Sequence, residues 1–141
     1  MEVRTRHWGV VEVAEDRVVH FPEGIPGFPH SRNFALLGEP GGLFLWLQSV
    51  DEPDVVLPVA DPFTLFRGYE VPLDQEDVEA LSVASPQEVA VLVVVTVRSD
   101  PLEATANLAA PILVNTARRL GRQKVLADSA YSVRHPLFVT E

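Results

Sequence analysis

Short apolar runs separated by turn residues make up most of this chain. Nine such runs are predicted to be strands, at residues 3–5, 10–13, 18–21, 34–37, 43–48, 55–60, 89–97, 112–115 and 124–126. Valine supplies most of them, and its branched Cβ atom favours a pleated surface over a helix. Because turn signals recur roughly every ten residues, the pattern predicts an all-β fold. We expect a small antiparallel β-barrel-like or sandwich domain with one or two short helices.

The run from Val89 to Val97 has no polar alternation, which predicts a central strand buried on both faces. Residues 105–115 follow it with small side chains, two asparagines and a proline. One interpretation is structural: the small residues permit close backbone approach, while Asn107 or Asn115 hydrogen-bonds a neighbouring loop. The other is that this segment contacts a partner directly. The sequence leaves both open.

Residues 74–81 are the best helix candidate. Asp74 can cap the free amides of the first turn, and Glu76 and Asp77 suit its positive end. A weaker helix or turn is expected at residues 116–120, stopped by Gly121, and a hairpin turn at residues 38–42 before Leu43. No linker or internal repeat interrupts the pattern, so we expect one domain over residues 1–141.

Acidic residues outnumber basic ones by 20 to 11, giving a formal charge of −9. Phosphate binding needs clustered cations, so direct binding of nucleic acid is disfavoured. A basic protein partner would suit the charge, because complementary charge speeds encounter. The plainer explanation, that acidity keeps the protein soluble, stays open.

The chain has no cysteine, which excludes disulfides, thiolate nucleophiles and cysteine-ligated zinc. Its first residues carry charge where a secretory signal would be apolar, and no run is long enough to span a membrane. We therefore expect a soluble, cytoplasmic protein.

No catalytic constellation is apparent. The phosphate-binding glycine loop and the serine nucleophile elbow are both absent, and the four histidines lack metal-site spacing. The acids at 51–54 are typical of a solvated turn between strands. We expect no enzyme activity, no metal and no cofactor.

Two surfaces remain as candidates. The acidic residues at 74–79 are either a docking face for a basic partner or an ordinary solvated helix face. The loop residues Ile25, Phe28, Phe63, Phe66 and Tyr69 either fold back as core plugs or form an apolar patch that receives a partner's helix.

Several ordered motifs resemble the flagellar assembly factor FliW family. They are Phe-Pro-Glu-Gly-Ile-Pro-Gly-Phe at 21–28, Leu-Gln-Ser-Val-Asp-Glu-Pro at 47–53, Asp61-Pro62, the segment 105–115, Gly-Arg-Gln at 121–123 and Asp-Ser-Ala-Tyr at 128–131. The resemblance runs from about Gly9 to Leu137. Residues 56–58 depart from the family pattern, because they lack the expected aromatic residue.

The resemblance implies a non-enzymatic partner switch. FliW-like proteins bind an amphipathic terminal helix of flagellin, in a chaperone-like manner, and also bind the translational repressor CsrA. Secretion of flagellin frees them to capture CsrA and relieve repression of flagellin mRNA. The antagonism is understood as allosteric, away from the RNA-binding surface.

We predict that Ile25, Phe28, Phe66 and Tyr69 contribute to the flagellin surface, and that the acidic helix contributes to CsrA capture. The full set of candidate partner-binding residues is Ile25, Phe28, Asp61, Phe66, Tyr69, Asp74, Glu76, Asp77 and Asn107. Which of them contacts which partner is left open.

Two other classes of function stay open, because a fold does not fix a function. One is a small β-barrel enzyme or metabolite-binding protein with a pocket formed by Asp51, Asp61, Asn107 and His135. The other is a structural subunit, which would self-associate through an exposed sheet edge.

Overall fold

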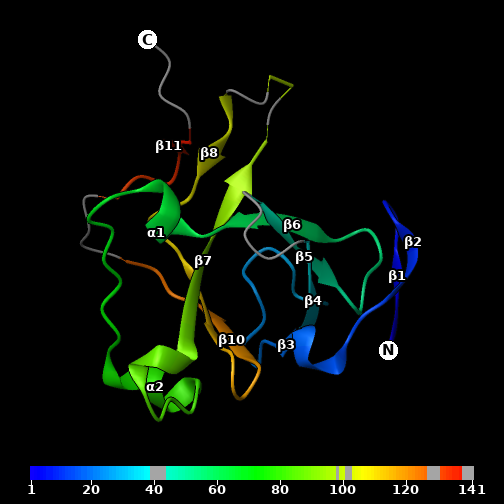
Figure 1. Cartoon of the computed structure of the whole chain (residues 1–141), viewed down its shortest axis with the longest axis horizontal. Coiled ribbons are helices and arrows are strands. Elements are labelled where there is room, and N and C mark those ends of the chain that lie inside the picture. Colours follow the sequence, from blue (N-terminus) through cyan, green and yellow to red (C-terminus); the bar gives the residue numbers. More distant parts are fainter. Residues whose placement is uncertain (39–43, 98, 101–102, 127–130, 138–141) are drawn as a thin grey trace.

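A computed structural model describes residues 1–38, 44–97, 99–100, 103–126 and 131–137. Its main feature is a closed barrel (Figure 1). The barrel strands are β3 (Val18–His20), β4 (Asn33–Leu37), β5 (Leu45–Ser49), β6 (Val56–Ala60), β7 (Val89–Thr96), β9 (Ile112–Asn115) and β10 (Leu120–Gln123). They are hydrogen-bonded in the order β7-β6-β5-β4-β3-β10-β9, and β9 pairs back with β7. The all-β expectation is confirmed, as a barrel rather than a sandwich.

All pairings in the barrel are antiparallel except one. β3 and β10 run parallel and pair only at His20 and Leu120. Closure depends on the 112–115 strand, which pairs with β10 along one edge and with β7 along the other.

Large apolar side chains fill the barrel. Phe21, Phe34, Leu47, Val59 and Ile112 belong to one buried cluster. The rings of Phe21 and Phe34 meet edge to face, with centroids 5.4 Å apart. The strands are rich in β-branched residues because these pack well on both sides of such a wall.

The strand predicted at 89–97 is buried on both faces in its central part, at Leu92, Val93 and Val95, whereas Ala90, Thr96 and Val97 are exposed. Leu92 belongs to the barrel core. Its neighbour Val93 points to the opposite face and packs outside the barrel with Tyr69, Ala106 and Leu108. The outer cluster is completed by two short strands, β8 (Thr105–Ala106) and β11 (His135–Pro136), which the sequence pattern did not reveal.

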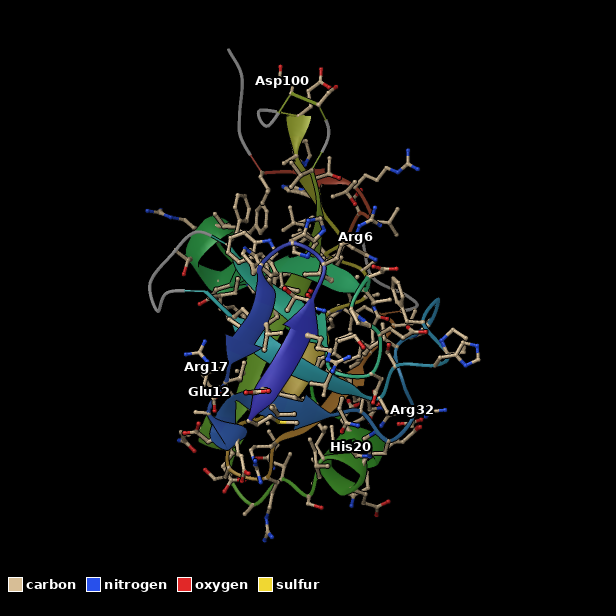
Figure 2. The ribbon with its side chains drawn as sticks, turned by 90° about the vertical axis from the view of Figure 1, so that its right-hand side faces the viewer. Arg6, Glu12, Arg17, His20, Arg32 and Asp100 are labelled. Carbon is tan, nitrogen blue, oxygen red and sulfur yellow. The ribbon has the colours of Figure 1, made fainter. Side chains whose placement is uncertain are left out.

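A separate hairpin covers another part of the barrel wall. It consists of β1 (Glu2–Thr5) and β2 (Gly9–Glu12), and it lies across the barrel strands in Figure 2. Val3 and Val13 pack against Ala35 of β4. The 3-10 turn η1 (Glu15–Arg17) leads from the hairpin into the barrel.

The helices are short. α2 (Gln75–Ala80) confirms the helix predicted at 74–81, and Asp74 and Asp77 form a reciprocal capping box at its start. α1 (Pro62–Leu65) was not predicted; Asp61 accepts the Phe63 N–H at 2.9 Å and Pro62 occupies the first turn. A second 3-10 turn, η2 (Pro86–Glu88), precedes β7.

One prediction near the end of the barrel was wrong. No strand forms at 124–126; the strand of this region is β10 at Leu120–Gln123, although the N–H groups of Lys124 and Leu126 donate to the carbonyls of Pro111 and Ala109. A second prediction is confirmed in part: of the helix or turn expected at 116–120, the turn is present at residues 116–119, but Gly121 is not a stop signal, because it lies in β10 beside the Phe21 ring.

Most other strand predictions agree with the structure to within one or two residues. Leu43, where a strand was expected to start, lies outside the described residues. Within the described chain, no helix is long and apolar enough to cross a membrane.

Candidate functional site

The acidic helix face pairs with cations of this same chain. Arg122 Nη2 lies 2.5 Å from Glu76 Oε1, and Arg122 Nη1 lies 3.4 Å from Asp77 Oδ1. Lys124 Nζ contacts Asp77 Oδ2 and lies 3.3 Å from Asp74 Oδ2. These ion pairs hold α2 against β10 and against Lys124, which follows that strand.

Burial divides these acids into two groups. The side chain of Asp77 is only 3% exposed, whereas those of Glu76 and Asp74 are 76% and 61% exposed. The Asp77 carboxylate is therefore buried between two cations and stabilises the fold, whereas the carboxylates of Glu76 and Asp74 remain open to solvent. Glu79 is also exposed, and Gln75 donates to it at 3.1 Å.

The pKa directions follow from these contacts. The backbone N–H of Asp77, with help from Lys124, holds the pKa of Asp74 below its ordinary value. Burial opposes the charged form of Lys124, but hydrogen bonds to Asp77 and Asp74 raise its pKa overall. Charge on this face is thus stabilised at neutral pH.

Phe66 and Tyr69 come together on the outside of β7 and β8. Together with Leu108, Tyr131 and His135 they line a groove of about 370 Å³. The ring of Phe66 meets the His135 ring edge to face at 4.7 Å, and Tyr69 meets Tyr131 at 4.7 Å. These side chains form an aromatic patch on the described surface, and it contains Phe66 and Tyr69, which the sequence analysis placed in loops.

Tyr69 mainly stabilises the patch from within and offers little accessible surface. Its side chain is buried, and its hydroxyl donates a 2.7 Å hydrogen bond to the Leu108 carbonyl. Burial and the neighbouring Tyr131 raise the pKa of Tyr69 to about 12. Phe66 is only half-buried, so it is the more accessible of the two predicted residues.

Ile25 and Phe28 lie elsewhere, in the turn that follows β3. Ile25 is 4% exposed and belongs to the barrel core, while Phe28 is half-buried against the same cluster. A backbone hydrogen bond of 2.9 Å from the Phe28 N–H to the Ile25 carbonyl closes the turn. Both side chains fold back on the barrel, which favours the core-plug interpretation for this pair.

Asp61 and Asn107 each stabilise a local turn. Asp61 caps α1 and lines a groove of about 570 Å³ whose walls come from α1, β7 and the neighbouring barrel strands. Asn107 accepts the Ala109 N–H at 3.1 Å, and its own N–H donates to the Val94 carbonyl. The candidate residues therefore fall into several separate regions rather than one site.

Sequence reasoning missed the basic partners of the acidic helix. Arg122 and Lys124 lie two residues apart, which places their side chains on one face of an extended segment. That spacing was the available signal, but the acids they meet lie more than 40 residues earlier, so nothing local connected them.

The residues proposed for an enzyme pocket are dispersed among different contacts. Asp51 accepts the backbone N–H groups of Arg32 and Asn33 at 2.8 and 3.0 Å. The groove that contains Asp61 has no histidine among its lining residues, and the groove that contains His135 has no carboxylate among its own. Among the described residues, no group of three or more acids and histidines could hold a metal ion.

Comparison with known proteins identifies the family. The model of the family described as "FliW protein" matches residues 2–137. The chain belongs to the FliW family. It is 38% identical to the flagellar assembly factor FliW of Clostridium tetani over 100% of this chain and 98% of the relative. It is 40% identical to that of Geobacillus kaustophilus over 98% of this chain and 96% of the relative.

The FliW fold matches as well. A crystal structure of the flagellar assembly factor FliW superposes with a TM-score of 0.91 at 37% identity, covering 100% of this chain and 99% of the other. The likeness therefore extends over the whole barrel and the elements packed on it.

Proposed function

We propose that this FliW-family chain is a non-enzymatic flagellar assembly factor that acts as one domain in the cytoplasm. It binds flagellin in a chaperone-like manner and captures a CsrA-type translational repressor, which relieves repression of flagellin mRNA. It needs no cofactor and binds neither nucleic acid nor membrane directly. The observation that carries this proposal is the family match over residues 2–137.

The charge of the protein supports the repressor part of the proposal. With a formal charge of −9, the surface attracts a basic RNA-binding partner and repels RNA. Glu76 and Glu79 are exposed on α2 and form the accessible part of the acidic face, together with Asp74. Asp77 adds to the negative electrostatic potential of this face, although its side chain is buried.

The aromatic groove supports the flagellin part. Phe66 lies beside Tyr69 in a groove with apolar walls, and such a groove suits the apolar face of an amphipathic helix. Ile25 and Phe28 belong to the same proposal, with Phe28 the accessible member of that pair.

A three-component titration tests the switch. The protein is immobilised, flagellin is bound, and the CsrA-type repressor is added at increasing concentration. Displacement with equal mutual weakening of the two affinities supports the switch, because coupling between two ligands is reciprocal. Independent binding of both partners contradicts it, and failure of either to bind removes that partner from the proposal.

Two variant pairs assign the surfaces. Phe66→Ala should weaken flagellin binding about tenfold or more, whereas Val10→Ala, an exposed apolar residue of β2, should not. Glu79→Lys should weaken repressor binding and reduce its salt dependence. Glu103→Lys makes the same charge change at another exposed position and serves as its control.

A further inference from the structure

The first half of β7 has an open backbone edge. β6 pairs with β7 only at Val59 with Val94 and Ala60 with Val93. The chain then leaves the sheet at Asp61 to form α1, so no described strand continues alongside residues 89–92 on that side.

Backbone groups of successive residues in a strand point to opposite sides, so the hydrogen bonds of β7 show which groups face this edge. Thr116 N–H donates to the Glu88 carbonyl at 2.8 Å, and Asn107 N–H donates to the Val94 carbonyl at 2.9 Å. Even-numbered residues of β7 therefore direct their backbone groups toward β8 and β9. The C=O of Val89 and both backbone groups of Val91 point the other way, toward the gap that β6 leaves.

Within the described chain, nothing pairs with these groups. Continuing the β6 register would bring Pro62 opposite Val91, but proline has no N–H and its carbonyl accepts the Phe66 N–H at 2.8 Å. The Val89 N–H donates to the Pro86 carbonyl, where it closes the 3-10 turn η2. The Val89 C=O and both backbone groups of Val91 have no partner among the described residues.

An apolar groove lies along the same edge. It has a volume of about 570 Å³ and is lined by α1, by residues 89–92 of β7 and by apolar side chains of β3, β4, β5 and β9, so it reaches toward the barrel core. Phe63 of α1 is 53% exposed there. Figure 1 shows α1 beside the upper part of β7, with the chain then passing down to α2.

We propose that this groove binds an extended segment of a partner protein, which adds to the open edge of β7 as a strand. Free backbone donors and acceptors in apolar surroundings are satisfied by another extended backbone, whereas a helix has already used its own. The groove walls suit small or β-branched side chains at alternate positions.

Charge indicates the flanking residue of that segment. Asp61 stands exposed at the rim, and only its Oδ1 accepts a hydrogen bond from a described residue. The second carboxylate oxygen of Asp61, Oδ2, can accept a hydrogen bond from a cation of the partner. Because the protein carries a formal charge of −9, this favours a lysine or arginine at the end of the segment. This surface is separate from the acidic face of α2 and does not depend on the partner assignments above.

The probe is the capped synthetic peptide Lys-Val-Thr-Val-Thr-Val-Thr-Lys, titrated into the isotope-labelled full chain and followed by NMR. In the free protein, the amide of Val91 should exchange with solvent much faster than those of Ala90 and Leu92. Peptide binding should be saturable below about 5 mM and should protect the Val91 amide. A version N-methylated at alternate residues should lose at least tenfold in affinity.

Asp61→Asn tests the charge while keeping the α1 cap, since asparagine caps as well as aspartate. It should weaken binding of the lysine peptide about threefold. A peptide with glutamate at both ends should instead bind the variant more tightly than the native protein. Val10→Ala is the matched control, because Val10 is exposed on β2 and does not line the groove.

Four results would overturn the proposal. The first three are no saturable binding of the lysine peptide, binding without protection of the Val91 amide, and equal binding of the N-methylated peptide. A helical peptide of the same charge that binds as well as the extended one would also overturn it, since the backbone edge would then not be the determinant.

Discussion

The side-chain amide of Asn115 donates a 2.7 Å hydrogen bond to the carbonyl of Leu81, across 34 residues of sequence. Asn115 ends β9, and Leu81 is the C-cap of α2, so this bond fastens the helix to the barrel. The same amide lies 3.3 Å from the Ser82 carbonyl, while Asn115 Oδ1 accepts the N–H groups of Ala117 and Arg118. One fully buried side chain therefore organises both the end of α2 and the turn before β10.

Asn115→Ala should lower the free energy of unfolding by about 2–4 kcal/mol, because it leaves buried backbone groups without partners. Urea denaturation followed by far-ultraviolet circular dichroism measures this. Asn107→Ala is the control: Asn107 is half-buried and caps a single N–H, so its loss should cost about 1 kcal/mol or less. Equal effects at the two positions would contradict the role assigned to Asn115.

Asp77→Asn should destabilise the protein by about 3 kcal/mol, because it leaves Arg122 and Lys124 facing each other without the buried charge that pairs with both. Thermal and urea denaturation measure the loss. Glu79→Gln removes a charge from the same helix at an exposed position and should change stability by less than about 0.5 kcal/mol. If the two variants were equally stable, the ion-pair cluster would not fasten α2.

Stability should fall in acid partly through Asp51. Burial opposes its charge, but the N–H groups of Arg32 and Asn33 hold the pKa of Asp51 below its ordinary value of 3.8. A lowered folded-state pKa means that this contribution is complete above about pH 4 and is lost as the pH falls through the folded value. Asp51→Asn should therefore be less stable than the native protein at pH 6, with the difference shrinking toward pH 2. Melting temperatures across that range measure it, and a constant difference would contradict the assignment.

Local chemistry made much of this fold predictable. Valine-rich runs located the barrel strands, and Asp74 as N-cap with Glu76 and Asp77 in the first turn located α2, because capping depends only on neighbouring residues. The loss of alternation over residues 89–97 indicated a strand buried on both faces, which is correct for its central part. These features are set by side-chain type and spacing, which the sequence contains directly.

Long-range relationships were not predictable in the same way. The closing pair β7–β9 and the parallel contact between β3 and β10 depend on how the sheet curves, which no local pattern specifies. The sequence indicated either a docking face or a solvated face for the acidic helix, and not an ion-paired one, because its cations, Arg122 and Lys124, become neighbours only in the folded barrel. Ile25 looked like a loop residue for the same reason, although it is buried in the core.

Gly121 gives the sharpest test of the barrel packing. A Cβ atom at this position would lie 2.5 Å from the ring of Phe21, closer than any real contact. Gly121→Ala should therefore cost about 1–3 kcal/mol by overpacking. Phe21→Leu shortens the obstructing ring, so the double variant should lose less stability than the sum of the two single variants, by about 1 kcal/mol or more. Urea denaturation of all four proteins completes the cycle. Strict additivity would mean that Gly121 is required for its backbone rather than for the space that Phe21 occupies.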